Sequence, residues 1–213
     1  MLPKQIAGIA IPDSAMAREA TALVRDVESD LLFDHSLRVF IFGALQGNKS
    51  GLVYDAELLY LGAMFHDVGL TEKYRSPSER FEVDGANAAR KFLQQHGVPA
   101  ASIELVWDAI ALHTTPGIPK WKQAEVALVT AGVELDVMGV GYDHLSNAER
   151  EAVLAAFPRV DFKRQIVQAF CDGIAHKPET AFGNVKADVL EKLLPGYIRP
   201  NFCSIIAASP FAN

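Results

Sequence analysis

Residues 62–70 read GAMFHDVGL and place an adjacent histidine and aspartate at the end of an apolar segment. In a helix, positions three and four apart share one face. His66 shares such a face with Leu59 and Ala63, so the sequence predicts that His66 is buried. Asp67 is expected to close the same helix. Two polar groups at this place need a partner, because burying a polar group without one costs free energy.

Helical spacing of apolar residues continues along most of the chain, while alternating strand patterns are nearly absent. This pattern predicts an all-α bundle of roughly eight helices that ends in an apolar tail. The 213 residues demand no second domain, so residues 1–213 are expected to form one helical domain whose motif-bearing core covers about 32–140. The expected helices span about 13–30, 32–46, 55–66, 76–97, 102–113, 124–139, 146–158 and 161–177, with a short one at 185–193.

The composition limits the partners and the location to be expected. The formal net charge is −6, and no Lys/Arg-rich run is present, so nucleic acid is not an expected partner. No apolar stretch approaches the length of a membrane span and residues 1–14 do not read as a signal peptide, so we expect no membrane association and a cytoplasmic location. Cys171 and Cys203 lack CxxC spacing, which is typical of a reducing compartment. The apolar tail would pack on the body or on a second subunit, so a homo-oligomer is left open.

Polar residues also interrupt the apolar faces of other helices. Asp136 stands between Val133 and Val140 on one helical stripe, and His113 and His35 lie on similar faces. Each alone has an ordinary interpretation, as a core histidine satisfied by a hydrogen bond or as an aspartate that caps a helix or pairs with an arginine. Together, neutral imidazoles and two carboxylates suit a divalent ion, whose charge the carboxylates cancel. The predicted ligands of one such ion are His35, His66, Asp67 and Asp136.

The order of these ligands, a histidine, an adjacent His-Asp pair and a distant aspartate, resembles the HD-domain superfamily of metal-dependent phosphohydrolases and related enzymes. The resemblance covers about residues 34–140. The segments DHSLRVFIFG, MFHDVGL, RFEVDGANAARKFL, DAIALHTTPGI and ALVTAGVELDVMG are similar to the cyanamide hydratase-like branch of that superfamily. The resemblance implies a zinc-type site, with iron, manganese and magnesium also open, and addition of water to a nitrile-like carbon, giving urea from cyanamide.

The middle of the motif bears on the number of ions and on proton transfer. Superfamily members that hold two metals add histidines there, whereas this chain has Glu82 and Asp84 at one position and His113 with Thr114 at the other. This difference favours a single ion. His113, Asp84 and Glu82 are the candidates for moving protons. An equally good interpretation of Glu82 and Asp84 is that they interact favourably with the helix dipole in the first turn of a helix. Thr114 has an alternative interpretation as a turn residue. The candidates for substrate binding are Phe65, Leu70, Lys73 and Thr114.

Three functions are compatible with these residues. The main expectation is a hydratase in which a metal-activated water attacks a small nitrile-type substrate. The alternative is a phosphohydrolase acting on a phosphomonoester or nucleotide, with Lys73, Arg75 and Arg80 available to hold phosphate. A non-catalytic binding protein of the same fold is the third, and the intact set of ligands argues against it. In each case the expected partner is a small molecule.

Overall fold

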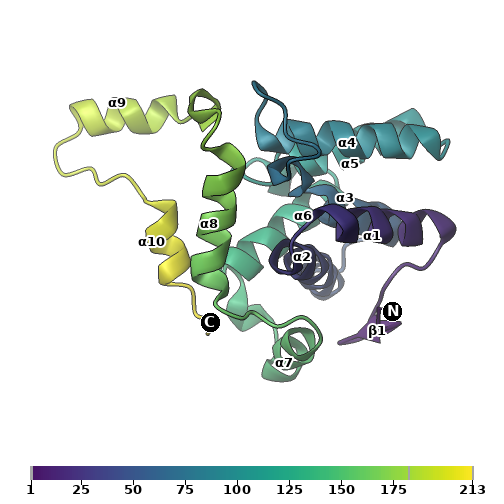
Figure 1. The fold of residues 1–213 in the computed structure, drawn as a ribbon. Helices are drawn as coiled ribbons and strands as arrows, with labels where there is room; N and C mark the ends of the chain where they lie inside the picture. The colour runs from purple at the N-terminus through teal and green to yellow at the C-terminus, as the bar shows by residue number, and fades with distance from the viewer. Residues whose placement is uncertain (1, 182, 213) are drawn as a thin grey trace.

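The structure is a computed structural model that describes residues 2–181 and 183–212, and it is a bundle of α-helices, as the sequence predicts (Figure 1). The α-helices are α1 (Ala15–Val27), α2 (Asp30–Lys49), α3 (Ala56–Phe65), α4 (Phe81–Gln95), α5 (Ala100–Ala111), α6 (Ala124–Val133), α7 (Asn147–Ala156), α8 (Phe162–Ile174), α9 (Val185–Leu193) and α10 (Phe202–Ala207). Short turns are η1 (Val68–Leu70), η2 (Pro119–Trp121), η4 (Tyr142–His144) and η5 (Pro178–Ala181), with one π-helical turn, η3 (Glu134–Met138). Strands β1 (Gln5–Ile6) and β2 (Ile9–Ala10) form an antiparallel hairpin that the sequence pattern did not predict.

The helix ends follow local capping chemistry. Ser14 caps α1 by accepting a hydrogen bond from the backbone N–H of Ala17 at 3.0 Å. The helix was expected to reach residue 30, but it ends at Val27 because Glu28 and Ser29 adopt extended backbone. Ser29 then caps α2. The short extended link places Glu28 between two helices, where its side chain is buried.

Helix α2 occupies the centre of the bundle and packs against α6 and α3. It is the longest helix, with 20 residues, yet no helix of the described residues is both long and apolar enough to cross a membrane. Its contact with α6 is close at the backbone level. A Cβ on Gly43 would lie 2.5 Å from the carbonyl oxygen of Leu128, and one on Gly132 would overlap the carbonyl of Val39. Glycine is required at both positions because any side chain would force the two helices apart.

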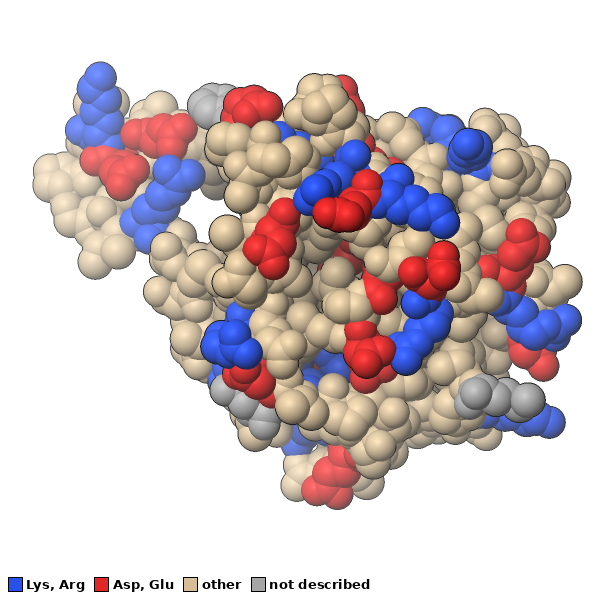
Figure 2. All heavy atoms as spheres, viewed as in Figure 1, with Lys and Arg blue, Asp and Glu red and all other residues tan. Residues whose placement is uncertain are grey.

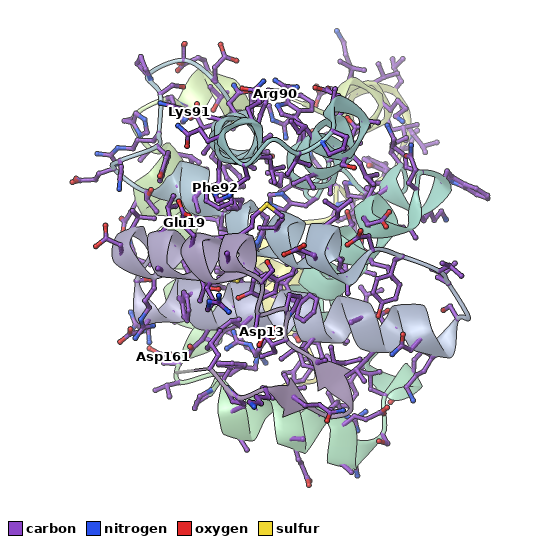
Figure 3. The ribbon with its side chains drawn as sticks, turned by 90° about the vertical axis from the view of Figure 1, so that its right-hand side faces the viewer. Asp13, Glu19, Arg90, Lys91, Phe92 and Asp161 are labelled. Atoms are coloured by element: carbon purple, nitrogen blue, oxygen red, sulfur yellow. The ribbon has the colours of Figure 1, made fainter. Side chains whose placement is uncertain are left out.

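Helix α4 lies beside α1 and α3. Figure 3 shows Glu19 on the side of α1 nearest Phe92 of α4, and Glu19 Oε2 lies 3.5 Å from Nε2 of His96. The ring of Phe92 packs against Phe65 with centroids 5.3 Å apart. Phe65 therefore belongs to the core beneath α4. Its role in substrate binding stays a prediction.

The C-terminal segment packs partly on the body of the protein. Phe211 is buried against Tyr142 and Phe42, with ring centroids 4.8 and 5.9 Å apart. Ile206 of α10 is buried beneath α8, whereas α9 stands away from the bundle (Figure 1). Of the two places considered for the apolar tail, the body is therefore the one that its buried residues occupy.

We predict that Gly132→Ala lowers the free energy of unfolding by about 1–3 kcal/mol, since the added methyl group overpacks the contact between α2 and α6. Denaturant unfolding followed by circular dichroism measures the change. Gly183→Ala is the matched control, because a Cβ there meets nothing closer than 4.0 Å. Equal stability of the two variants would contradict the close contact.

Candidate metal centre

Three side chains from two neighbouring segments meet in the interior. His35 lies on α2, and His66 and Asp67 follow the last turn of α3; their exposed fractions are 1%, 0% and 0%. Nε2 of His66 lies 3.2 Å from Nε2 of His35 and 3.2 Å from Oδ2 of Asp67, while His35 Nε2 and Asp67 Oδ2 are 3.7 Å apart. Ligands roughly 2.1 Å from a tetrahedral ion lie about 3.4 Å from one another. The three atoms thus have the spacing of metal ligands, and they form a candidate metal site.

The histidine rings are fixed through their other nitrogens. His66 Nδ1 lies 2.7 Å from the carbonyl oxygen of Ala63, and His113 Nδ1 lies 2.6 Å from that of Ile110. A carbonyl oxygen only accepts hydrogen bonds, so each Nδ1 carries the hydrogen and each Nε2 keeps a lone pair. His35 has the same tautomer, because its Nδ1 faces a carboxylate. All three rings therefore present a nitrogen lone pair, which is the donor that a metal ion takes.

Several buried polar atoms of this cluster have no hydrogen-bond partner among the described residues. They are both carboxylate oxygens of Asp67 and Nε2 of His113, which lies 3.7 Å from Asp67 Oδ1. Burial opposes the charged form of His66, yet Asp67 outweighs burial and raises the pKa of His66. The same contact holds the pKa of Asp67 well below its usual value in spite of burial. The cluster thus favours a positive charge at its centre, and its nitrogen and oxygen donors fit a divalent ion.

Asp136 lies outside this three-residue cluster, so its prediction as a fourth ligand stays a prediction. Its Oδ2 lies 2.6 Å from Nδ1 of His35, on the side of the ring opposite Nε2. Arg38 donates to Oδ1 and Oδ2 at 2.9 and 3.0 Å, and Arg159 donates to Oδ1 at 2.8 Å. Burial opposes ionisation, but Arg38, His35 and Arg159 hold the pKa of Asp136 far below its usual value. Asp136 therefore orients His35 as a carboxylate, and the interpretation as an aspartate paired with arginine describes it.

A π-helical turn explains the position of Asp136. Helix α6 gives way to η3, in which Leu135, Asp136 and Val137 are all buried. Gly139 then ends the turn with a φ of 76°. The sequence predicted that Val140 lies on the same buried helix face as Val133 and Asp136. This prediction is wrong for Val140, which is 52% exposed. A widened turn of this kind is frequent at functional sites because it redirects one side chain without ending the helix.

His113 approaches the cluster from the end of α5. Its ring packs edge-on against His66 and Phe81, with centroids 4.9 and 5.6 Å apart. Burial, followed by the neighbouring His66, lowers the pKa of His113 to about 4. The imidazole is therefore neutral at pH 7. Its free Nε2 can accept a hydrogen bond or a metal ion, but it carries no proton to donate.

The two acids predicted as proton carriers lie beside the cluster rather than in it. Burial opposes ionisation of Glu82, but hydrogen bonds from Arg80 at 2.5 Å and from Thr114 outweigh it and lower the pKa of Glu82. Asp84 accepts from the buried Lys177 at 2.7 Å and from a backbone N–H of the preceding loop at 2.9 Å. Both carboxylates are thus held by cations. The contacts of Thr114 likewise tie it to Glu82 and Arg80 instead of to the cluster.

A cavity of about 500 Å³ opens between the end of α1, the start of α2, the loop after η1 and α8. Leu70 and Lys73, both predicted to bind substrate, line it, and so do Asp26, Leu32 and Arg75. Leu32 and Leu70, which line the cavity, lie three residues from His35 and Asp67 along the chain. Figure 2 shows acidic and basic side chains interspersed on the face that carries α1 and α8.

Helix α8 covers the cluster from the outside. The ring of Phe162 lies 5.5 Å from the ring of His35, and Phe170 packs at 90° against Phe81 with centroids 5.4 Å apart. Near the opposite end of α8, Gly173 lies against Leu70, close enough that a Cβ would reach 2.6 Å from its Cδ2. The helix therefore helps to exclude bulk water from the cluster.

The protein family described as the HD domain matches residues 32–154. This range is more than half of the 213 residues, and it contains all the predicted ligands together with His113. Arg159 and α8 follow its end. No curated protein matches the chain.

We predict that His66→Ala and Asp67→Ala each lose bound metal, because each removes a donor from the cluster. Asp136→Asn should retain metal with about 10–100-fold weaker affinity, the usual effect of removing a group that orients a histidine ligand. Elemental analysis and metal titration of the folded variants measure this. His96→Ala at the end of α4 is the control and should bind like the parent protein. Complete loss of metal in folded Asp136→Asn would make Asp136 a ligand after all.

Metal affinity should also fall with pH. The raised pKa of His66 means that a proton competes for its Nε2 already near neutral pH, and metal binding releases that proton. We therefore expect the affinity for Zn²⁺ to fall by about tenfold per pH unit below the raised pKa. Calorimetric titrations at several pH values provide the measurement. A constant affinity between neutral pH and about pH 6 would show that His66 does not bind the ion.

Proposed function

Because this chain belongs to the HD-domain family, we propose that it is a metal-dependent hydratase that adds water to a small nitrile-type carbon, converting cyanamide to urea. HD domains are generally metal-dependent hydrolases, which gives the broader class. The observation that carries the proposal is the cluster of His35, His66 and Asp67, with two carboxylate oxygens of Asp67 left without hydrogen-bond partners. The nitrile-type substrate rests on the sequence resemblance and on the charge of the cavity.

The available ligand atoms favour a single metal ion per chain. Glu82 and Asp84 stand where a second ion would need ligands, and both are engaged by cations, Arg80 and Lys177. Neutral imidazole nitrogens with one carboxylate suit zinc first, with iron, manganese or magnesium as alternatives. When bound, such an ion lowers the pKa of a water molecule towards roughly 7 and so makes hydroxide available at neutral pH.

The protein's own groups would orient the reaction. His113 keeps a lone pair on Nε2 beside Asp67, so it can accept a hydrogen bond from the attacking water and hold it in line with the substrate carbon. Asp136 keeps the ring of His35 in the tautomer that faces the cluster. Phe162 of α8 excludes further water, which strengthens these polar interactions.

The charge of the cavity supports a small neutral substrate. Lys73 lies 3.8 Å from Asp26, and Arg75 lies 3.4 Å from Glu72. Each cation that lines the cavity thus has a carboxylate nearby, which competes with a phosphate for that cation. A neutral molecule such as cyanamide needs no such partner.

A phosphohydrolase is the second candidate, and the position of Lys73 favours it. Lys73 and Arg75 both line the cavity, and their partners Asp26 and Glu72 are mostly exposed, with side-chain exposures of 77% and 91%. Exposed ion pairs are weak, so an incoming phosphate could displace them. A non-catalytic binding protein is the third candidate, and the free donors of the cluster argue against it.

The test is a paired assay of one metal-loaded preparation, measuring urea from cyanamide and phosphate from a generic phosphomonoester. We expect one ion per chain and urea release. Phosphate release without urea would establish the phosphohydrolase instead. If neither urea nor phosphate is formed, the third candidate, the non-catalytic binding protein, is favoured.

His113→Ala should keep its metal and lower kcat by at least about 100-fold, because the water then loses the group that orients it. Metal content and steady-state kinetics of the same preparation measure both properties. Trp121→Ala, which changes a residue that is 81% exposed, serves as the control and should keep parental activity. An unchanged kcat in His113→Ala would show that His113 is a structural residue of the core without a role in turnover.

A further inference from the structure

Residues 185–205 form an arm that carries a large share of the exposed apolar surface. The arm comprises α9, the link that follows it and the start of α10, and its α9 end stands away from the bundle (Figure 1). Among the described residues, 14 large apolar side chains are exposed, and eight of them belong to the 21 residues of the arm. The eight are Val185, Val189, Leu190, Leu193, Leu194, Ile198, Phe202 and Ile205. Single exposed apolar side chains are ordinary, but such a concentration marks an interaction surface.

Helix α9 presents its apolar face outward, because its polar face is engaged within the arm. Val189 and Leu193 are four residues apart and share one face of the helix. Asp188 and Glu191 lie on the opposite face, and Arg199 of the link is 2.9 Å from the first and 3.8 Å from the second. Figure 2 shows open space between the α9 end of the arm and the body of the protein. The link thus covers the polar face of α9, and the apolar face is left without cover.

The chain is attached to the body on both sides of the arm. Before the arm, Lys177 is fully buried and donates to Asp84 at 2.7 Å. After it, Ile206 is buried beneath α8, and Lys163 of α8 donates to the carbonyl oxygen of Ser209 at 2.9 Å. The arm is therefore held in place before any partner binds, which reduces the entropy that an interface would cost.

The area of this surface fits a second copy of the chain. The exposed fractions of the eight side chains range from 39% for Ile205 to 86% for Ile198. A fully exposed residue of this size presents roughly 200 Å², so the eight offer on the order of 800 Å². That is about the area each partner contributes to a standard stable interface, and it exceeds the roughly 300–600 Å² of the largest apolar patch on a typical monomer.

The charge of the arm also favours a second copy over a membrane or a nucleic acid. Lys186, Lys192 and Arg199 stand against Asp188 and Glu191, so the net charge is three minus two, or +1. Amphipathic helices that lie on membranes are rich in Lys and Arg on their polar face, and nucleic acid needs a basic patch. In a two-fold dimer the same patch meets itself, so an apolar and nearly neutral surface is complementary to its own copy.

We propose that the arm is the interface of a two-fold homodimer, in which the apolar face of α9 packs against the arm of a second copy. The proposal goes beyond the proposed function and depends on neither the metal nor the reaction. Leu193 and Ile198 are the most exposed of the eight, with exposed fractions of 72% and 86%. They are expected to lose the most accessible surface in the dimer, so they are the residues to change.

The experiment measures the mass of the full chain in solution by light scattering after size-exclusion chromatography, over a range of concentrations. The parent protein should form a dimer of about 46 kDa, twice the 23.2 kDa of one chain. Leu193→Glu and Ile198→Glu each place a charge in the interface and should raise the dissociation constant of the dimer by at least about 100-fold. Val53→Glu is the matched control and should remain a dimer, because Val53 is 93% exposed and lies outside the arm.

Circular dichroism should show the same helix content in all variants, because the substituted side chains are exposed in the single chain. The mass of one chain for the parent protein at every concentration would overturn the proposal. So would a dimer of parental affinity in both Leu193→Glu and Ile198→Glu. Sedimentation with phosphatidylserine vesicles tests the other occupant. Vesicle binding by a monomeric parent protein that Leu193→Glu abolishes would overturn the dimer and assign the arm to a lipid surface.

Discussion

The site depends on the buried contact of Asp136 with two guanidinium groups. Arg38 and Arg159 hold this carboxylate as an anion in an interior where an unpaired charge would be costly. Because the anion is secured in this way, its second oxygen is available to Nδ1 of His35 and fixes the tautomer of that ring. The free Nε2 then meets His66 and Asp67 at the spacing of metal ligands. Removing the arginines would thus affect His35 through Asp136.

The carboxylates around the cluster differ in whether a cation pairs with them. Glu82 beside the cluster is matched by Arg80, whereas Asp67 faces the centre of the cluster. Asp67 is left with unpartnered oxygens, and its charge raises the pKa of both His66 and Glu28. The unpartnered carboxylate of Asp67 therefore creates a place for a cation.

Helical periodicity was sufficient to predict the all-α fold and the burial of His66, because both follow from the spacing of apolar residues along the helices. It was not sufficient for Asp136, since the π-helical turn η3 changes the spacing that the prediction assumed. Arg159 and Lys177 were missed because their carboxylate partners lie far away in the sequence, and nothing local distinguishes them from surface cations. Glu28 was read as part of the first helix, whereas its extended backbone appears only once Ser29 is seen to cap the next helix.

The segment beyond the matched HD range completes the site. The donors themselves lie within residues 32–154, on helices that pack around α2. Arg159 supplies the second guanidinium to Asp136, Phe162 covers His35, and Lys177 engages Asp84. Without these three residues, Asp136 would keep one arginine, the cluster would be open to water on the α8 side, and Asp84 would lose its cation. The HD helices therefore provide the donors, while the C-terminal segment sets the charge state and the water content of the place where they meet.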